Sequence, residues 1–508
     1  MARKVLLLAC VFLVGLAAWA APKPGGEMVI GFGTDPESLD PNKITSAPAG
    51  MVLTHVAETL LLMTEDLKVA PLLVENWTVS EDGLTVLLYI RKGVFFHDGA
   101  PLNADAVKVN LERFRTATYA FLLFPRVNTI DVVDEYTVRF NLDKPFAPLI
   151  AHLTHNFVAI VSPKQIAELP AGKDILEPVG TGPFKFDAWV RGDYVRLVRN
   201  GNYWGDKAYL DSVVFKVIPS DATRLVLLET GQLHAMMRVP PLDASRVAAT
   251  AGLELLNIPS VRTIYIAFNY QKAPFTDVRI RQAINYAVDK EAIVKEVLGG
   301  VGGVSDAAIM PLVFGHAGQE PYTYDPEKAR DLLKAAGFPN GFKCTLYHPT
   351  GRYMMDAAVA EAVQAYLAEV GIDAKLVTME WAAYLAYLRK PQPEATFDMF
   401  MLGWGCVTLD ADYGLFALFH TSEWAPVGSN RSFYSDPTVD TLLDLARVVS
   451  DPVGRRATYA SLLTYLWKDA PWLYLHYEGQ LNAQRTVAKD LIHHPREYIL
   501  AHKAWLDQ

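Results

Sequence analysis

The chain has 508 residues, of which 51% are hydrophobic and 20% are charged, and its formal net charge is −9 at pH 7. This length exceeds that of one ordinary domain, so we expect two or more domains, each with enough apolar residues for a core. The negative charge argues against nucleic acid or an anionic membrane surface as the main partner, since both attract a basic protein face.

The N-terminus has the three parts of a secretory signal peptide. Arg3 and Lys4 precede an unbroken apolar run, which closes with the small-residue sequence "AWA" at residues 18–20. Because this run is short for a membrane span, we predict that residues 1–20 direct export and are then removed. The sequence "LLAC" at residues 7–10 also resembles a lipoprotein cleavage box, so lipid anchoring stays open as the less favoured alternative.

The first half of the chain, to about residue 260, favours short strands with a few helices. An apolar stretch over residues 83–99 predicts a strand that is closed by a turn at Asp98-Gly99. A helix is expected next, because Asn103 is a good N-cap and three later apolar residues share one helical face. Further strands are expected over residues 136–142, 194–200 and 210–218.

The second half of the chain, from about residue 261, alternates strands with helices. Asp325 is the expected N-cap of a helix that begins at Pro326 and stops at Gly337. Strand, helix, strand, helix and strand then follow over residues 343–349, 356–370, 373–379, 381–389 and 397–404. Such alternation predicts a largely parallel sheet. Two more helices are expected, one opened by Asp436-Pro437 and one over residues 453–467.

No flexible linker separates these two halves, so we expect two lobes that are joined by short crossing segments, with a cleft between them. In an open parallel sheet, ligands lie in the crevice outside the carboxyl ends of the strands. Two loops leave such ends, one after residue 349 and one after residue 404. The side chains expected to face this one crevice are Arg352, Tyr353, Trp404, Asp410 and Asp412.

The same placement separates the two cysteines of the mature chain. Cys344 lies at the start of its strand, whereas Cys406 lies just past the end of its own. In parallel neighbours those positions are at opposite ends, tens of Å apart at about 3.3 Å per residue. We therefore expect two free thiols.

Catalytic signatures are missing from the sequence. It contains no G-x-x-x-x-G-K-[ST], G-x-S-x-G, H-E-x-x-H or C-x-x-C. Asp410 and Asp412 are candidates for a glycosidase pair, but such carboxyls flank a sugar ring at about 5–9.5 Å, whereas these two leave one strand end together. We therefore expect a binding site and no enzyme, with no catalytic residue, metal or cofactor.

A family resemblance extends over nearly the whole mature chain. The matching pieces include, in this order, "GTDPESLDPN", "LTVLLYIRKGVFFHDGAPLNADAVKVNLER", "VGTGPFKFDAW", "VRNGNYWG", "TIYIAFNYQKAPFTDVRIRQAINYAVDKEAIV" and "YDPEKARDLLKAAGFPNGF". The chain resembles the exported solute-binding components of peptide-type ABC importers (solute-binding protein family 5). That group includes dipeptide-, oligopeptide-, nickel- and glutathione-binding proteins.

The resemblance implies an α/β, two-lobe periplasmic-binding-protein fold of the cluster C type. The implied bounds are residues 21–262 for lobe I, with an extra subdomain at about 60–190, residues 263–478 for lobe II, and residues 479–508 for a C-terminal return to lobe I. It also implies that a small peptide is enclosed in the cleft and delivered to the membrane permease subunits of an ABC importer. We expect a periplasmic monomer.

One departure from the family pattern bears on the ligand. In dipeptide and oligopeptide relatives, an aspartate three residues after the tryptophan of the "GW" motif holds the ligand's α-amino group. Here that position is Val407. A buried ammonium without a carboxylate partner is strongly unfavourable, so a standard peptide N-terminus is not expected there. The run "DADYGLFALFHTSEWAPVGSNRSFYSDP" instead resembles the glutathione-binding branch.

Three arginines are candidate anchors for ligand carboxylates. Arg352 matches the position where dipeptide relatives hold the ligand carboxylate, and its guanidinium can bind both oxygens at once. Arg431 is a second candidate, and Arg262, near the hinge, is a third. Glutathione has two carboxylates, which suits more than one arginine. We expect Trp404 to stack on the ligand or to wall the pocket, and glutathione or a similar modified peptide to be the ligand.

Two alternatives stay open. The first is a metal-chelate or haem carrier of the same fold, since His348 and His420 flank the expected cleft. The second is a secreted hydrolase that acts on sugars or peptides, which the missing motifs disfavour.

Overall fold

A computed structural model gives the fold of residues 21–44 and 46–507. The signal peptide that we predict over residues 1–20 lies outside the described residues. Within them the chain is mixed α/β and is built around one sheet of eleven strands. No helix in these two ranges combines the length and the apolarity that crossing a bilayer requires.

The large sheet runs through the whole molecule. Its strands in spatial order are β15 (Asp373–Met379), β14 (Lys343–Pro349), β16 (Met399–Gly405), β12 (Leu253–Phe268), β17 (Trp472–Arg485), β11 (Ala235–Met236), β1 (Glu27–Phe32), β10 (Ser212–Val217), β9 (Tyr194–Arg199) and β8 (Phe184–Val190), and β13 (Gly303–Val304) pairs with β17. Strands from both halves of the sequence therefore share one sheet.

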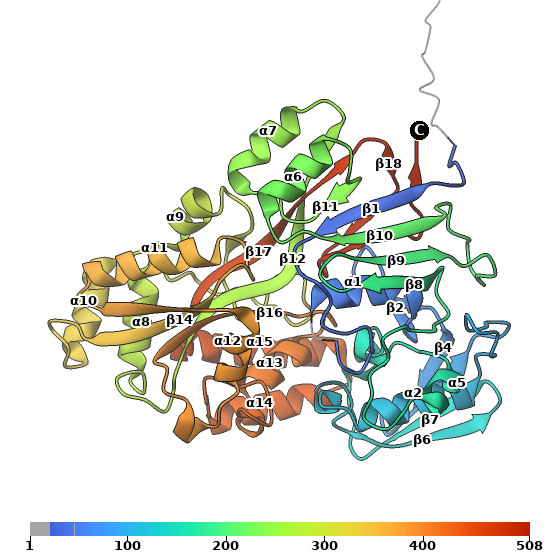
Figure 1. The fold of residues 1–508 in the computed structure, drawn as a ribbon. Coiled ribbons are helices and arrows are strands. Elements are labelled where there is room, and N and C mark those ends of the chain that lie inside the picture. The colour runs from blue at the N-terminus through green and yellow to red at the C-terminus, as the bar shows by residue number, and fades with distance from the viewer. Residues whose placement is uncertain (1–20, 45, 508) are drawn as a thin grey trace, which may run out of the picture.

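Two long strands connect the halves. β12 and β17 are antiparallel partners from Leu253 opposite Arg485 to Ala267 opposite Trp472, with irregularities on the way. Figure 1 shows them side by side through the centre of the molecule. The expected lobe boundaries, at residues 262–263 and 478–479, fall within these two strands. We retain those boundaries as the proposed division into lobe I and lobe II.

Smaller sheets belong to the first half and to the C-terminal tail. One has four strands in the order β4 (Val74–Val79), β5 (Thr85–Ile90), β7 (Thr137–Leu142) and β6 (Val127–Asp134). The others are the pairs β2 (Leu61–Met63) with β3 (Val69–Pro71), β18 (Ala488–Lys489) with β21 (Trp505–Leu506), and β19 (Ile492–His494) with β20 (Tyr498–Leu500). The four-stranded sheet lies within the range expected for the extra subdomain.

Helices cover the sheets in both halves (Figure 1). Those of the first half are α1 (Ala47–Val56), α2 (Ala104–Arg115), α3 (Ala120–Leu123), α4 (Leu149–His152), α5 (Pro163–Glu168), α6 (Asp221–Glu229) and α7 (Ala244–Ala249). Those of the second half are α8 (Val278–Ala287), α9 (Lys290–Ala292), α10 (Pro326–Ala335), α11 (Asp356–Glu369), α12 (Trp381–Leu388), α13 (Ala411–Phe419), α14 (Pro437–Val448) and α15 (Pro452–Asp469).

The helix ends follow from local chemistry, as the sequence predicts. The Asn103 side chain accepts a hydrogen bond of 2.9 Å from the backbone N–H of Ala106 and caps α2. Asp325 caps α10 in the same way, through the N–H of Lys328 at 2.9 Å. Gly337 follows α10 with a φ of +94°, a conformation that a side chain disfavours. Both predicted helices are confirmed.

The predicted parallel arrangement is confirmed only for the outer strands of the second half. β14 pairs in parallel with β15 and with β16. β16, however, is antiparallel to β12, and β12 is antiparallel to β17. The sheet is therefore mixed, because the two connecting strands come from outside the strand–helix alternation.

The strand that we predict over residues 83–99 is shorter in the structure. Only Thr85–Ile90 form β5, after which the chain turns at Gly93, where φ is +75°. Phe95 then makes an isolated bridge with Pro101. The apolar residues beyond the turn still pack, since Val94 and Phe96 are buried. The apolar pattern over residues 83–99 therefore indicates which side chains are buried, but it does not indicate a continuous strand.

Both cysteines in the described residues are free, as predicted, and both are buried. Cys344 lies in β14, and Cys406 lies just past the end of β16.

Candidate ligand-binding cleft

A cavity of about 180 Å³ lies where the two halves meet. Its wall from the first half comes from α1, from residues 119–122 and from residues 155–157. Its wall from the second half comes from the loops after β14 and β16, from α12, and from residues 429–431. The tail supplies Arg496 and Tyr498. At about 10–15 Å³ for each water-sized group, this volume suits a small molecule such as a short peptide.

The cavity brings together most of the residues that the sequence predicts. Six of the eight line it, namely Arg262, Arg352, Tyr353, Trp404, Val407 and Arg431. For Arg352, Tyr353, Trp404 and Val407 the reason is topological, since the carboxyl ends of the neighbouring parallel strands β14 and β16 lie at the same edge of the sheet.

Asp410 and Asp412 do not line the cavity, which corrects the expectation that they face the crevice. Asp410 forms two bonds of 2.6 Å with Arg455, and Asp412 forms one of 2.6 Å with the Nε of Arg447. All four side chains are buried. Asp410 also caps α13 by accepting a 3.0 Å bond from the N–H of Asp412. Both aspartates therefore stabilise α13 from within the core.

Arg352 is the clearest unpaired cation of the cavity. Its guanidinium lies 5.0 Å from the ring centre of Tyr353 and 5.1 Å from that of Trp381. It forms no ion pair with the described residues. Burial, with a contribution from neighbouring Arg262, lowers the pKa of Arg352. Asp356 fixes the loop by accepting bonds from the backbone N–H groups of Arg352 and Tyr353, at 2.8 and 3.1 Å.

Arg262 differs from Arg352, because the protein itself neutralises its charge. Its Nε and Nη2 bind the two oxygens of Glu497 at 2.8 and 2.9 Å, and Glu478 lies 3.1 Å away. Although burial lowers the pKa of Arg262, Glu497 outweighs that effect and the pKa is raised. Arg262 is thus an expected anion anchor that already has two carboxylate partners.

Arg431 is buried and forms no ion pair with any described residue. Its Nε has no hydrogen-bond partner, and burial lowers its pKa. The preceding residue, Asn430, shapes the loop, since its side-chain oxygen accepts bonds from the Ser432 hydroxyl and the Tyr434 N–H at 3.0 and 3.1 Å.

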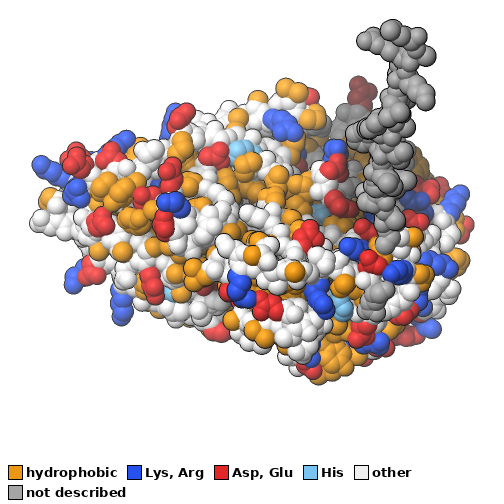
Figure 2. Space-filling model, turned by 90° about the horizontal axis from the view of Figure 1, so that it is seen from above, with side chains coloured by type: hydrophobic (Ala, Val, Ile, Leu, Met, Phe, Trp, Pro, Cys, Tyr) orange, Lys and Arg blue, Asp and Glu red, His pale blue; other side chains and the backbone are white. Residues whose placement is uncertain are grey.

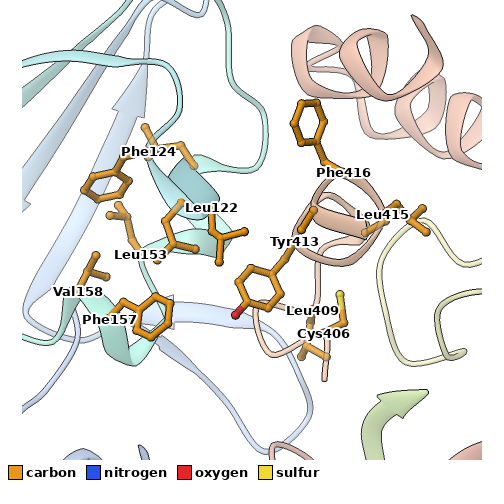
Figure 3. Close-up of a cluster of buried hydrophobic side chains, with 14 of the residues drawn as sticks. Leu122, Phe124, Leu153, Phe157, Val158, Cys406, Leu409, Tyr413, Leu415 and Phe416 are labelled. Atoms are coloured by element: carbon orange, nitrogen blue, oxygen red, sulfur yellow. The ribbon is translucent and has the colours of Figure 1, made fainter. Parts of the chain in front are cut away.

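Aromatic side chains form the remaining wall. The rings of Trp404 and Tyr413 lie 5.5 Å apart, and the Nε1 of Trp404 is a buried donor without a partner among the described residues. Figure 3 shows Tyr413 extending from α13 toward Phe157 of the first half. His155 Nε2 and the Tyr413 hydroxyl are 3.2 Å apart, so a polar contact crosses the cleft.

Sequence reasoning missed several lining residues, of which Arg496 is the most consequential. It lies between β19 and β20 in the tail, and its two terminal nitrogens bind Thr154 at 3.0 Å (carbonyl) and 2.6 Å (hydroxyl). Its Nε has no partner, and burial lowers its pKa to about 10. The only signal was an Arg-Glu pair between two short apolar runs. Arg389, which donates to the Tyr119 hydroxyl, was also missed.

The charged side chains that line the cavity are basic, although Glu497 and Glu478 neutralise one of them, Arg262. Five arginines line it, and among the described residues no aspartate or glutamate does. The outer surface is different, because acidic and basic side chains are interspersed on the face shown in Figure 2. A positive cavity in a negatively charged protein suits a small anionic ligand that is rich in hydrogen-bond acceptors.

The two histidines of the metal-carrier alternative do not line the cavity. His348 is buried and contacts the carbonyl oxygen of Pro349 and the hydroxyl of Thr378. His420 contacts the Ser422 hydroxyl. Within residues 21–44 and 46–507, no group of three or more His, Cys, Asp or Glu side chains is arranged to hold a metal ion.

Comparisons with known proteins agree on one family. The profile described as "Bacterial extracellular solute-binding proteins, family 5 Middle" matches residues 68–426. The glutathione-binding protein GsiB of Salmonella choleraesuis (strain SC-B67) is 33% identical over 479 residues, which are 92% of this chain and 93% of that protein.

Two solved structures are similar in fold. The periplasmic binding protein DppA of Helicobacter pylori, in complex with the peptide STSA, has a TM-score of 0.87 at 30% identity and covers 96% of this chain and 99% of its own. AgaA of A. tumefaciens R10, in complex with agropinic acid, has a TM-score of 0.84 at 26% identity and covers 95% and 99%.

Proposed function

The chain belongs to the bacterial extracellular solute-binding proteins of family 5, and we propose that it captures glutathione or a similar modified peptide for import. Its fold is the two-lobe fold of the periplasmic peptide-binding proteins. It is a periplasmic solute-binding protein of the peptide ABC-importer type. The partners of such a protein are a small ligand and the permease subunits of an importer.

The observation that carries the proposal is the positive charge of the side chains that line the cavity. Of the residues that the structure describes, five arginines and no acidic residue line it, so a ligand with carboxylates gains charge-assisted hydrogen bonds there. Arg352 is the proposed carboxylate anchor, because its planar guanidinium forms no ion pair with a described residue and lies close to two aromatic rings. Trp404, Tyr353 and Arg431 are further proposed contacts.

The choice of glutathione rests on two supports. Relatives at 33% identity over nearly the whole chain are named glutathione-binding proteins. Val407, which lines the cavity, offers no carboxylate to the free N-terminus of an ordinary peptide. Glutathione has two carboxylates for the arginines, and its free amino group has a carboxylate beside it in the ligand itself.

The proposed mechanism is capture by lobe closure. Residues of both lobes line the cavity, and contacts such as His155 with Tyr413 already span it. A ligand favours the closed form only through contacts that the open form does not make. The permease would then receive the closed, loaded protein. We expect no turnover of the ligand by this protein.

Thermal unfolding of the mature protein tests the proposal. We expect millimolar glutathione to raise the unfolding temperature by several degrees, because a ligand at about 1,000 times its Kd adds about 4 kcal/mol to stability. Triglycine at the same concentration is the control and should leave the transition unchanged. An equal shift with both, or with neither, would contradict the assignment of glutathione.

The role of Val407 can be tested by restoring a carboxylate. In Val407→Asp, a free peptide N-terminus would find an ionic partner, so we expect the affinity for triglycine to rise roughly tenfold. Val407→Asn has nearly the same size without the charge and is the matched control. Calorimetric titration of both variants with triglycine measures this difference in affinity. Equal affinities would show that residue 407 does not contact the amino group of the ligand.

A further inference from the structure

Buried arginines elsewhere in the described chain have carboxylate partners. These pairs are Arg224 with Asp221, Arg281 with Asp469, Arg447 with Asp412, and Arg455 with Asp410. Arg431 and Arg496 are buried to a similar degree, with 8% and 7% of each residue exposed. Neither forms an ion pair with any residue in the described ranges, and both line the cavity.

Leaving such charges unpaired is unfavourable, since a buried cation without a counter-charge loses its hydration and gains nothing in return. The Nε atoms of Arg431 and Arg496 also lack hydrogen-bond partners, as does the Nε1 of Trp404. All three are N–H donors that belong to residues of one cavity. The two unpaired guanidinium charges are explained if a ligand in the cavity supplies the negative charge.

Arg431 and Arg496 come from different proposed lobes. Arg431 lies beyond α13, in the same proposed lobe II as Arg352. Arg496 lies in the tail that returns to lobe I, and its bonds to Thr154 hold it there. A ligand anion at each wall would therefore link the lobes directly.

We propose, on the basis of the proposed function, that the cleft selects a small dicarboxylate, with one carboxylate held by Arg352 and Arg431 of lobe II and the other by Arg496 of lobe I. Such a ligand makes its second ionic contact only when the lobes are closed, so the contact favours closure. Because no acidic side chain lines the cavity among the described residues, an amino group on the ligand is blocked, absent or paired with the ligand's own carboxylate.

The test uses matched ligands on the wild-type protein. Calorimetry would compare glutathione with its two monoamides, in which one or the other carboxylate is neutral, and would compare N-acetyl-Ala-Glu with its own two monoamides. We expect each amidation to weaken binding at least about thirtyfold, because a buried arginine then loses its ionic partner.

Two variants then assign the lobe I subsite. Arg496→Gln should weaken binding of the diacid at least about thirtyfold, yet leave the affinity for one of its monoamides almost unchanged, because that ligand lacks the carboxylate that Arg496 holds. Arg496→Lys keeps the charge and should retain part of the affinity. Arg456→Gln removes an exposed arginine that does not line the cavity and is the control for net charge. Unfolding of the ligand-free variants checks the fold.

The outcomes separate this inference from the assignment of glutathione. Monoamides that bind as tightly as the diacids would overturn the dicarboxylate requirement and leave glutathione standing. Binding of N-acetyl-Ala-Glu without binding of glutathione would support the dicarboxylate and overturn glutathione. If Arg496→Gln weakened the diacid and both monoamides equally, its role would be structural and the lobe I subsite would be refuted. If no diacid bound, both proposals would fail.

Discussion

Replacing Asp410 by alanine is expected to lower the free energy of unfolding by about 3–5 kcal/mol, with the larger part arising from Arg455. Both oxygens of Asp410 bind the Arg455 guanidinium at 2.6 Å, and both side chains are at most 6% exposed. Without Asp410, that guanidinium stays buried and unpaired. The N-terminus of α13 also loses its cap, at about 1 kcal/mol.

Urea unfolding of the ligand-free protein measures this effect. Asp66→Ala is the matched control, because Asp66 and its partner Lys68 are exposed, and a surface pair of this kind contributes little. A loss of less than about 1 kcal/mol for Asp410→Ala would contradict the structural role assigned to the pair. If Asp410→Ala kept its stability but lost its affinity for the ligand, Asp410 would instead be assigned to the binding site.

The Arg352→Ala variant is expected to lose about 2–4 kcal/mol of binding free energy for glutathione, which is a factor of about 30 to 1,000 in Kd. Its guanidinium forms no ion pair within the described chain, so no partner carboxylate is left unpaired in the empty protein. Its removal also relieves repulsion with Arg262. We therefore expect the unfolding temperature of the ligand-free protein to change little.

Titration calorimetry on Arg352→Ala and Arg352→Lys would check this expectation. Lysine keeps the charge but cannot bind both carboxylate oxygens with a rigid fork, so it should recover only part of the affinity. Affinity equal to wild type in both variants would exclude Arg352 from the site. A variant of Arg262 would not serve the same purpose, because removing this side chain leaves Glu497 and Glu478 buried without their partner.

Much of the fold could be predicted because its signals are local. The strands over residues 343–349 and 373–379 appear with the predicted bounds, and Asp325 and Asn103 cap the helices that they were expected to cap. Caps and periodic apolar residues act within one or two turns of the chain, so they are readable from the sequence. The limit appears at residues 83–99, where a turn at Gly93 interrupts an apolar stretch.

The location of the candidate site could be predicted from the sequence, but the residues that line it could be predicted only in part. A general rule of parallel sheets brings the loops after β14 and β16 together, and Arg352, Trp404 and Val407 do line one cavity. The same rule placed Asp410 and Asp412 there, and for these two it was wrong. It gave no means of finding Arg496.

The sequence by itself determined the element order, the helix ends, the family resemblance and the edge of the sheet where a ligand would lie. Only the tertiary structure decided which charges are free to meet that ligand. Asp410 and Arg455 are 45 residues apart, and Arg496 and Thr154 are 342 apart. Whether a buried charge is neutralised depends on partners at such distances, because electrostatic pairing follows separation in space and not along the chain.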